Sequence, residues 1–459
     1  MKRIAVCLFL LAALLTAGCG SQTTPPAAQT PAETPLPPPR QAPQKQGFVL
    51  ALYCEASGGL PAYAKFAGYN TVEILDHSFA LSDAQMANYL AGTPALIDTI
   101  HNYGLQVYVI LLTNESRNLN VRNIASNLGL NDYQVLFNPV TQPAEFNQRI
   151  TDVRQAVHTG FAAADGFEVF AGDPGGCVGS GCEVDQYIRF AKNFASIVRE
   201  LGTPAEVTWN TWAIANWGVT LGVGLDFWDA ETSLSKGIIA GDLSYSDAIT
   251  LPGHNFYRFL TLQLYTQAGR EVPNWPDRTA IDLIKSKGKR AYLWPHFIVD
   301  DDPARPQTWQ KMHFEVRYLQ NPARKVRDLG MNGVFVNCYN CPIQMGNIYA
   351  YGQLTKDPDK SPQEILKDFA TLVAQPSGVD QLTQVFIFME NHSWWGHQMP
   401  AQYQLPSLPG TLTTYDDAIA ALNQVMPLST SSAPLLMNPR DYLTAVGSTL
   451  LYMRNNYGF

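Results

Sequence analysis

Short apolar runs alternate with helical stretches along most of the chain, and this alternation limits the fold more than any other feature. Runs rich in Val, Ile and Phe recur from residue 47 to residue 338, and helical stretches separate them. This order is typical of parallel βαβ units, and about eight of them predict a closed (β/α)₈ TIM barrel. A doubly wound open sheet is the alternative, but no GxGxxG motif opens the chain and no P-loop is found.

The expected strands can be placed by their apolar runs. The sixth is the least distinct, and either 226–229 or 259–265 could supply it. Ser82 with Gln85 three residues later predicts a capping box at the start of a helix over 82–103. The other strands are expected at 48–55, 71–79, 106–112, 166–170, 205–212, 290–299 and 333–338.

Polar residues gather at the ends of these strands rather than at their starts. In a barrel the carboxyl ends of all strands meet on one face, where active sites are built. The convergence favours an enzyme, although loops are polar in any case. The candidate substrate-binding residues on this face are Glu55, Asp76, His77, Glu115, Asn210, Trp212, Trp294, His296, Asn337 and Tyr339.

The stretch 165–182 carries the first catalytic candidate. Glu168 lies inside an apolar run, where a charge is costly unless it is paired or used. Asp173 follows the run within Gly-Asp-Pro-Gly-Gly, a turn that lets the backbone approach a ligand closely. We predict that Asp173 is catalytic. The alternative is a strand end with a capped acidic turn.

Glu231 is the second catalytic candidate. It follows Phe227-Trp228-Asp229-Ala230, and burial beside aromatic rings would raise its pKa toward that of a useful acid. A solvated helix residue is the alternative. Glycoside hydrolysis requires two carboxyl groups, one acting as an acid and the other as a base or nucleophile. Asp173 and Glu231 are the predicted pair. Neither a GxSxG elbow nor an HExxH motif is found.

Composition limits the partners. The net charge of -8 argues against binding to nucleic acid or to an anionic membrane surface. The nine Trp and 21 Tyr residues suit the stacking of flat rings on sugars. We therefore expect a carbohydrate substrate, no nucleic acid, no cofactor and no metal. A run of three acidic residues at 300–302 could bind sugar hydroxyls or calcium, and is otherwise a solvated charge run.

The first residues resemble a bacterial lipoprotein signal. Lys2 and Arg3 precede an apolar core, and Leu-Thr-Ala-Gly then leads into Cys19. We expect cleavage after residue 18 and lipidation of Cys19. An ordinary signal peptide is the alternative. The expected location is the bacterial cell envelope, anchored by lipid to the outer membrane or cell surface, with no membrane contact beyond the anchor.

Four segments are expected on these grounds. The signal peptide covers 1–18, and a Pro-rich, disordered tether covers 19–46. The TIM-barrel glycosidase-like domain covers 47–375. A helical C-terminal region covers 376–459, with helices expected at 381–395, 415–426 and 439–457.

Five cysteines remain after Cys7 and Cys19 are set aside. In an oxidising compartment the close pairs Cys177/Cys182 and Cys338/Cys341 are disulfide candidates, which would leave Cys54 unpaired. A zinc site built from the two pairs is the alternative.

One segment resembles a known family. Residues 347–370 fit a G-x-L-x-x-(D/N)-P-x-x-S-x-x-E-I pattern through Gly352, Leu354, Asp357, Pro358, Ser361, Glu364 and Ile365. This resembles the region after the last barrel strand in α-glucuronidases and β-N-acetylhexosaminidase-like barrel glycosidases, and Ser361 with Glu364 also predicts a capping box. The resemblance implies a barrel glycosidase. The adjacent Asp-Glu pair of hexosaminidases is absent from the fourth strand, so no catalytic residue is carried over.

Together these features predict an extracytoplasmic, lipid-anchored glycoside hydrolase that cleaves a poly- or oligosaccharide with paired carboxyl groups. A non-catalytic glycan-binding lipoprotein and a structural envelope lipoprotein are the alternatives. The lack of a close acid pair would favour the glycan-binding protein, and the lack of a cleft would favour the structural protein.

Overall fold

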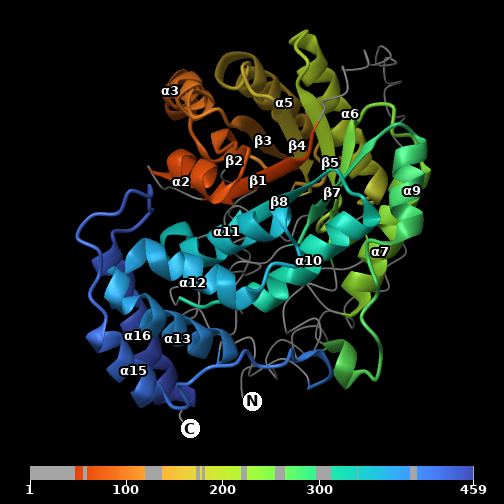
Figure 1. Ribbon diagram of the computed structural model, residues 1–459. Coiled ribbons are helices and arrows are strands. Elements are labelled where there is room, and N and C mark those ends of the chain that lie inside the picture. Colours follow the sequence, from red (N-terminus) through yellow and green to blue (C-terminus); the bar gives the residue numbers. More distant parts are fainter. Residues whose placement is uncertain are drawn as a thin grey trace, which may run out of the picture. The chain divides into compact units, whose positions relative to one another are not determined.

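The computed structural model describes residues 47–54, 59–118, 137–171, 176–177, 181–218, 225–253, 264–295, 312–338, 340–392 and 401–457. Within them a closed parallel barrel is formed by strands that pair in sequence order, with the last strand paired to the first (Figure 1). The TIM barrel is thus confirmed. Its strands are β1 (Val49–Cys54), β2 (Thr71–Leu75), β3 (Gln106–Leu112), β4 (Gly166–Phe170), β5 (Glu206–Asn210), β6 (Ala248–Pro252), β7 (Arg290–Trp294) and β8 (Gly333–Cys338).

Helices follow the strands around the ring, as parallel crossovers require. Short 3₁₀ turns, η1 (Ser78–Ala80) and η4 (Ile214–Asn216), follow β2 and β5. A π-helical turn, η3 (Ala156–Gly160), extends the helix before β4. The helices around the barrel are α2 (Leu60–Ala67), α3 (Asp83–Asn102), α5 (Pro143–Gln155), α6 (Val184–Glu200), α7 (Leu225–Ala240), α9 (Arg278–Ser286), α10 (Val316–Leu329) and α11 (Cys341–Lys356).

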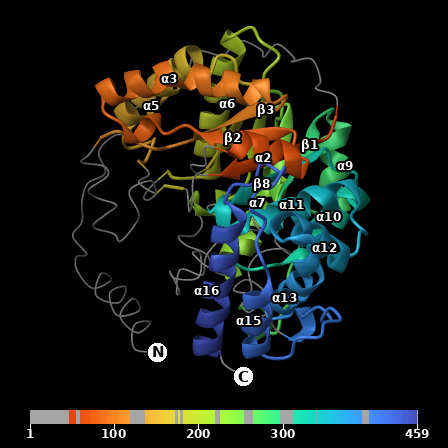
Figure 2. The same cartoon turned by 60° about the vertical axis from the view of Figure 1, so that its left-hand side comes forward.

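The C-terminal part is helical, as expected. Helix α12 packs against α11, α13 and α16, and α15 packs against α13 and α16 (Figure 2). Buried Arg317 of α10 and Glu390 of α13 form an ion pair at 2.9 Å that joins this region to the barrel helices. The helices are α12 (Pro362–Val373), α13 (Val379–Asn391), α15 (Tyr415–Gln424) and α16 (Pro439–Tyr457), with 3₁₀ turns η6 (Pro376–Gly378) and η7 (Ala401–Tyr403).

The sixth strand was predicted wrongly. It is β6, whose five residues Ala-Ile-Thr-Leu-Pro are entirely buried. Residues 226–229, one of the two expected positions, lie in α7. Phe227 and Trp228 are apolar because they pack from that helix into the cluster inside the barrel. Most of the other expected position, 259–265, lies outside the described residues.

Of the two predicted capping boxes, one forms. Gln85 Oε1 accepts a hydrogen bond from the backbone N–H of Ser82 at 3.0 Å, as predicted for the start of α3. The box at Ser361 and Glu364 was predicted wrongly, although Ser361 is indeed the residue before α12. Its hydroxyl instead bonds to the side chain of Gln363 at 2.9 Å.

Alternate residues along each strand face opposite sides of the barrel wall. One buried cluster lies between strands and helices and includes Leu50 and Leu52 of β1. The second fills the inside of the barrel, with Ala51 of β1, Tyr108 of β3 and Tyr292 of β7 among its members. The odd-numbered residues of β1, β2 and β8 and the even-numbered residues of β3 to β7 therefore point inward.

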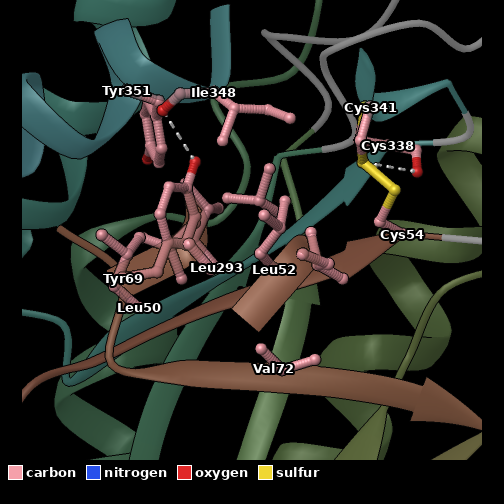
Figure 3. Packing of buried hydrophobic residues seen from close by; sticks show 14 of the residues in the cluster. Leu50, Leu52, Cys54, Tyr69, Val72, Leu293, Cys338, Cys341, Ile348 and Tyr351 are labelled. Atoms are coloured by element: carbon pink, nitrogen blue, oxygen red, sulfur yellow. Dashed lines mark hydrogen bonds between the residues drawn. A yellow bond between two sulfur atoms is a disulfide. The ribbon is translucent and has the colours of Figure 1, made fainter. Parts of the chain in front are cut away.

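Two disulfides are formed among the described residues, and one of them was not predicted. Cys177 bonds to Cys182 as expected. Cys54, predicted to be unpaired, bonds to Cys341, and Cys338 is a free, buried thiol. Figure 3 shows this bond reaching from the end of β1 to the start of α11, with Cys338 beside it. The prediction failed because Cys54 is in register with Cys338 on the neighbouring strand, which brings it close to Cys341 three residues later. Sequence spacing does not reveal this proximity.

A search of the described helices found none both long and apolar enough to span a bilayer.

Candidate active site

Two buried acids face each other inside the barrel. Glu73 of β2 and Glu168 of β4 are 2% and 1% exposed. The two carboxyl groups are hydrogen-bonded, and burial together with the neighbouring Glu168 raises the pKa of Glu73 well above its usual range. Burial raises the pKa of Glu168 to about 7, while hydrogen bonds from Glu73, Thr250 and Asn210 limit the rise. Near neutral pH, Glu73 is therefore the protonated donor and Glu168 is the member that titrates.

Asn210 of β5 holds Glu168 from the other side. Its Nδ2 donates to Oε1 of Glu168 at 3.1 Å, and its Oδ1 accepts from the backbone N–H of Trp212 at 2.8 Å. The hydroxyl groups of Thr208 and Thr250 bond to each other at 3.0 Å on the inward positions of β5 and β6. These contacts make a polar layer of uncharged donors around the acid pair.

A third interior acid lies nearer the amino ends of the strands and is neutralised differently. Glu206, the first residue of β5, forms an ion pair with Arg290 at 2.8 Å. It also accepts hydrogen bonds from the hydroxyl groups of Tyr108, at 3.0 Å, and Tyr292, at 2.5 Å. The side chain of Glu206 is paired with a cation and held by two phenol groups, so this layer is structural.

The Glu73–Glu168 pair contrasts with that layer. Among the described residues, each acid shifts the pKa of the other, and Thr250 and Asn210 also shift that of Glu168. None of these groups is a cation. Two carboxyl groups without a counter-ion keep one proton between them. Such a pair can accept or donate a proton near neutral pH, which is the property expected of an acid–base catalyst.

Glu231 is fully buried, but it is used differently from the prediction. Its Oε1 accepts from the backbone N–H of Ala213 at 2.8 Å, and its Oε2 accepts from that of Ala215 at 3.0 Å. Burial raises the pKa of Glu231 well above its usual range, and the backbone N–H groups lower it in part. With both oxygens held by backbone in the turn after β5, Glu231 does not fit the predicted catalytic role.

Asp76 and Glu115, after β2 and β3, lie around a buried arginine. Arg149 Nη1 is 3.9 Å from Asp76 Oδ2, and Arg149 also interacts electrostatically with Glu115. Arg149 donates to the carbonyl oxygens of Leu112, at 2.6 Å, and of Thr113, at 3.2 Å. Both acids are buried with this cation, so their immediate use is to balance its charge.

His77 is exposed and lies next to the acid–arginine group. Its backbone N–H points to the hydroxyl group of Tyr89 at 3.4 Å, and its ring lies 6.5 Å from that of Phe79. Asn337 of β8 is in register with Tyr53 of β1, which in turn is in register with Glu73. Asn337 thus occupies an inward position on β8, as Glu73 does on β2.

Aromatic rings lie beyond the acid pair, toward the carboxyl ends of the strands. Phe170 and Trp212 are the next inward residues after Glu168 and Asn210. Trp294 ends β7, and its ring centroid lies 5.2 Å from Trp212 and 5.6 Å from Phe170. The predicted residues Trp212, Asn210 and Trp294 are therefore brought together at one end of the barrel.

Four predicted residues lie outside the described part of the chain, so their predictions stay as they are: Glu55, Asp173, His296 and Tyr339. Glu73 was missed as a candidate. The sequence feature that could have identified it is a carboxyl group inside an apolar run, here Thr-Val-Glu-Ile-Leu, and Glu168 has the same feature.

Within the described residues no group of three or more His, Cys, Asp or Glu side chains could hold a metal ion. Four of the described cysteines form disulfides in place of the alternative zinc site, and Cys338 is a free thiol.

Comparisons with known proteins complete the description. No protein-family model matches the sequence. No curated protein matches it either. The endo-β-1,4-mannanase of Thermotoga petrophila aligns with a TM-score of 0.40 at 11% identity, over 69% of this chain and 78% of the mannanase.

Two further solved structures align similarly. A glycoside hydrolase family 30 subfamily 8 xylanase from Clostridium acetobutylicum gives a TM-score of 0.39 at 13% identity, over 69% of this chain and 72% of the xylanase. The malate synthase of Haloferax volcanii gives 0.36 at 11% identity, over 91% of this chain and 97% of the synthase. Two of these three proteins are glycoside hydrolases and one is not, and all three share little sequence identity with this chain.

Proposed function

We propose that this chain is a TIM-barrel glycoside hydrolase in which Glu168 supplies the proton. The observation that carries the proposal is the buried Glu168, whose pKa is raised to about 7 beside Glu73 and Asn210. Glycoside hydrolysis needs a carboxylic acid that is still protonated near neutral pH, so that it can protonate the departing oxygen. Glu168 meets this requirement inside the barrel, two residues before the carboxyl end of β4, and barrel active sites are built at that end of the strands.

The second carboxyl group has to come from elsewhere. The two reacting carboxyl groups of a glycosidase flank the scissile bond and lie about 5 Å or more apart. Glu73 is hydrogen-bonded to Glu168, which is too close for a sugar to fit between them. We propose Asp173 for this role, because it follows the same strand by three residues and lies in a Gly-rich turn.

The substrate class is proposed from the aromatic residues. The rings of Phe170 and Trp212 lie 5.6 Å and 5.2 Å from the ring of Trp294, around the strand ends. Flat rings near a proton donor suit a substrate with flat, weakly polar faces, as pyranose rings have. Carboxyl groups and Asn210 would bond to the hydroxyl groups of such a substrate.

The test is release of reducing sugar by the full chain over a panel of plant and bacterial polysaccharides. We expect Glu168→Gln and Asp173→Asn each to lower the rate by at least a hundredfold. Glu200→Gln is the matched control, because Glu200 is an exposed acid at the end of α6 that is paired with Arg154 of α5. Unchanged release by Glu168→Gln would remove Glu168 from the mechanism. Retention on a glycan column without any release would favour the non-catalytic glycan-binding alternative.

We also propose that the protein is lipid-anchored in the bacterial cell envelope through Cys19. The support is the sequence alone, since residues 1–46 lie outside the described part of the chain. Radiolabelled palmitate should be incorporated into the full chain and not into Cys19→Ala. Equal labelling of both would sink this part of the proposal.

A further inference from the structure

We infer that Glu231 is a positioning residue for Glu168, and that it acts through the turn after β5 and through Asn210. This deepens the proposed function and rests on it for the role of Glu168. The inference uses hydrogen bonds from Glu231 on α7 to the turn, from the turn to Asn210, and from Asn210 to Glu168 on β4. The backbone of the turn joins the first of these contacts to the second.

The first step is the turn itself. Ala213 has φ of 61°, and no other non-glycine residue in the described part of the chain has a positive φ. A side chain in this region is strained, so the conformation persists only where surrounding contacts impose it. The two oxygens of Glu231 accept from the N–H groups on either side of Ile214, at 2.8 Å and 3.0 Å. Glu231 thereby holds the turn in its strained form.

The second step is the amide of Asn210. The turn delivers the N–H of Trp212 to Oδ1 of Asn210 at 2.8 Å. Because the oxygen end of the amide is occupied by this donor, its nitrogen end has to face the other way. That end donates to Glu168 at 3.1 Å. The orientation of one amide therefore couples the turn to the carboxyl group.

Ring packing supports the same arrangement. Trp228 precedes Glu231 by three residues on α7, so the two side chains lie on one face of that helix. The ring of Trp228 lies 5.6 Å from that of Trp212. One face of α7 thus holds both the backbone of the turn and the ring that follows Asn210. Glu231 itself is fully buried, with both oxygens occupied, and so acts through other groups.

The experiment measures the ionisation of Glu168 in the full chain by pH-difference infrared spectroscopy. The carbonyl band of the protonated acid is assigned by its loss in Glu168→Gln. We expect Glu231→Gln to raise the midpoint of Glu168 ionisation by about one pH unit. The disturbed turn should break the hydrogen bond from Asn210 that stabilises the Glu168 carboxylate. Asn210→Ala should give a shift of the same sign and size. The double variant should shift no further than either single variant.

Glu390→Gln is the matched control. Glu390 is equally buried, and it also accepts from two backbone N–H groups, those of Val316 and Arg317. Glu390 lies on α13, so its replacement should lower the stability of the protein without moving the midpoint of Glu168 ionisation. A second variant, Glu231→Gln with Ala213→Gly, should recover part of the shift, because glycine adopts a positive φ without strain.

The remaining outcomes are decisive as well. An unchanged midpoint in Glu231→Gln, with a shift in Asn210→Ala, would overturn the relay. A lowered midpoint would overturn it too, since it would mean that Glu231 acts directly by its charge. Full glycan hydrolysis by Glu168→Gln would refute the proposed function, whereas the infrared shifts would still decide the relay.

Discussion

Glu73 of β2 donates a hydrogen bond to Glu168 of β4 across the inside of the barrel, past the strand that separates them. Two buried carboxyl groups that share one proton place a titratable group near neutral pH in a site where water is scarce. The position of that proton is the property of this molecule that matters most for its chemistry.

The first prediction concerns the role of Glu73 as a neutral donor. Glu73→Gln keeps a side-chain donor and should leave the midpoint of Glu168 within about half a pH unit of its original value. Glu73→Leu removes the donor and should raise the midpoint by about one unit or more. Infrared titration of the Glu168 carbonyl band measures both. A strong fall in Glu73→Gln would mean instead that Glu73 is ionised and repels Glu168.

The second prediction concerns stability against pH. The pKa of Glu168 is about 7 in the folded protein and about 4.3 in an unfolded chain. Between these values the folded state binds the extra proton, so stability is fully present below pH about 4 and falls as pH rises to about 7. Glu168 accounts for up to roughly 3 kcal/mol of this fall. Urea unfolding from pH 4.5 to 7.5 should therefore give a flatter curve for Glu168→Gln.

Glu200→Gln is again the control for this experiment. Arg154 lowers the pKa of Glu200, so that group titrates below the range measured and the variant should keep the original slope. Parallel curves for Glu168→Gln and the unmodified protein would contradict the prediction, since Glu168 would then not titrate in this range.

The third prediction concerns the disulfides. Non-reducing peptide mapping should link Cys54 to Cys341 and Cys177 to Cys182, and Cys338 should react with iodoacetamide only after unfolding. The bonds close loops of 287 and 5 residues. Loop entropy then predicts losses of roughly 6 kcal/mol and roughly 2 kcal/mol when each pair is replaced by serine. A recovered link between Cys338 and Cys341 would contradict the pairing.

The fourth prediction concerns a close approach between α11 and α2. A Cβ atom on Gly352 would lie 1.9 Å from the carbonyl oxygen of Ala67, so the helices would have to separate. Gly352→Ala should cost about 2 kcal/mol or more in urea unfolding. Gly237→Ala on α7 is the control, since its Cβ would meet nothing within 4 Å and helix propensity favours alanine by up to about 1 kcal/mol. Equal stability of both variants would argue against the close approach.

The sequence was informative where burial leaves a pattern. β3, β4 and β8 lie where their apolar runs were found, because parallel strands covered on both faces are continuously apolar. β6 was missed because it follows α7, whose neighbouring residues Phe227 and Trp228 form a more prominent apolar run. Length and hydrophobicity alone do not separate a short buried strand from a buried helix.

The sequence predicted which strand ends come together, but not the contacts among the buried acids. The position of Asn210, Trp212 and Trp294 at strand ends predicted that they lie close together, and they do. The pairing of Glu73 with Glu168 depends on which residues of β2 and β4 lie at the same level of the barrel, and register is not visible in either segment alone. Glu231 was singled out for burial beside aromatic rings, which is correct, but its partners are backbone N–H groups that leave no trace in sequence.

The closure of the barrel has a consequence for how the protein is made. β1 pairs with β8, and Cys54 at the end of β1 bonds to Cys341. A nascent chain therefore exposes both sheet edges, of β1 and of whichever strand was made last, until residue 338 has emerged. Such edges pair readily with other chains. Chains truncated anywhere before β8 should consequently be lost to aggregation or proteolysis rather than accumulate as partial barrels.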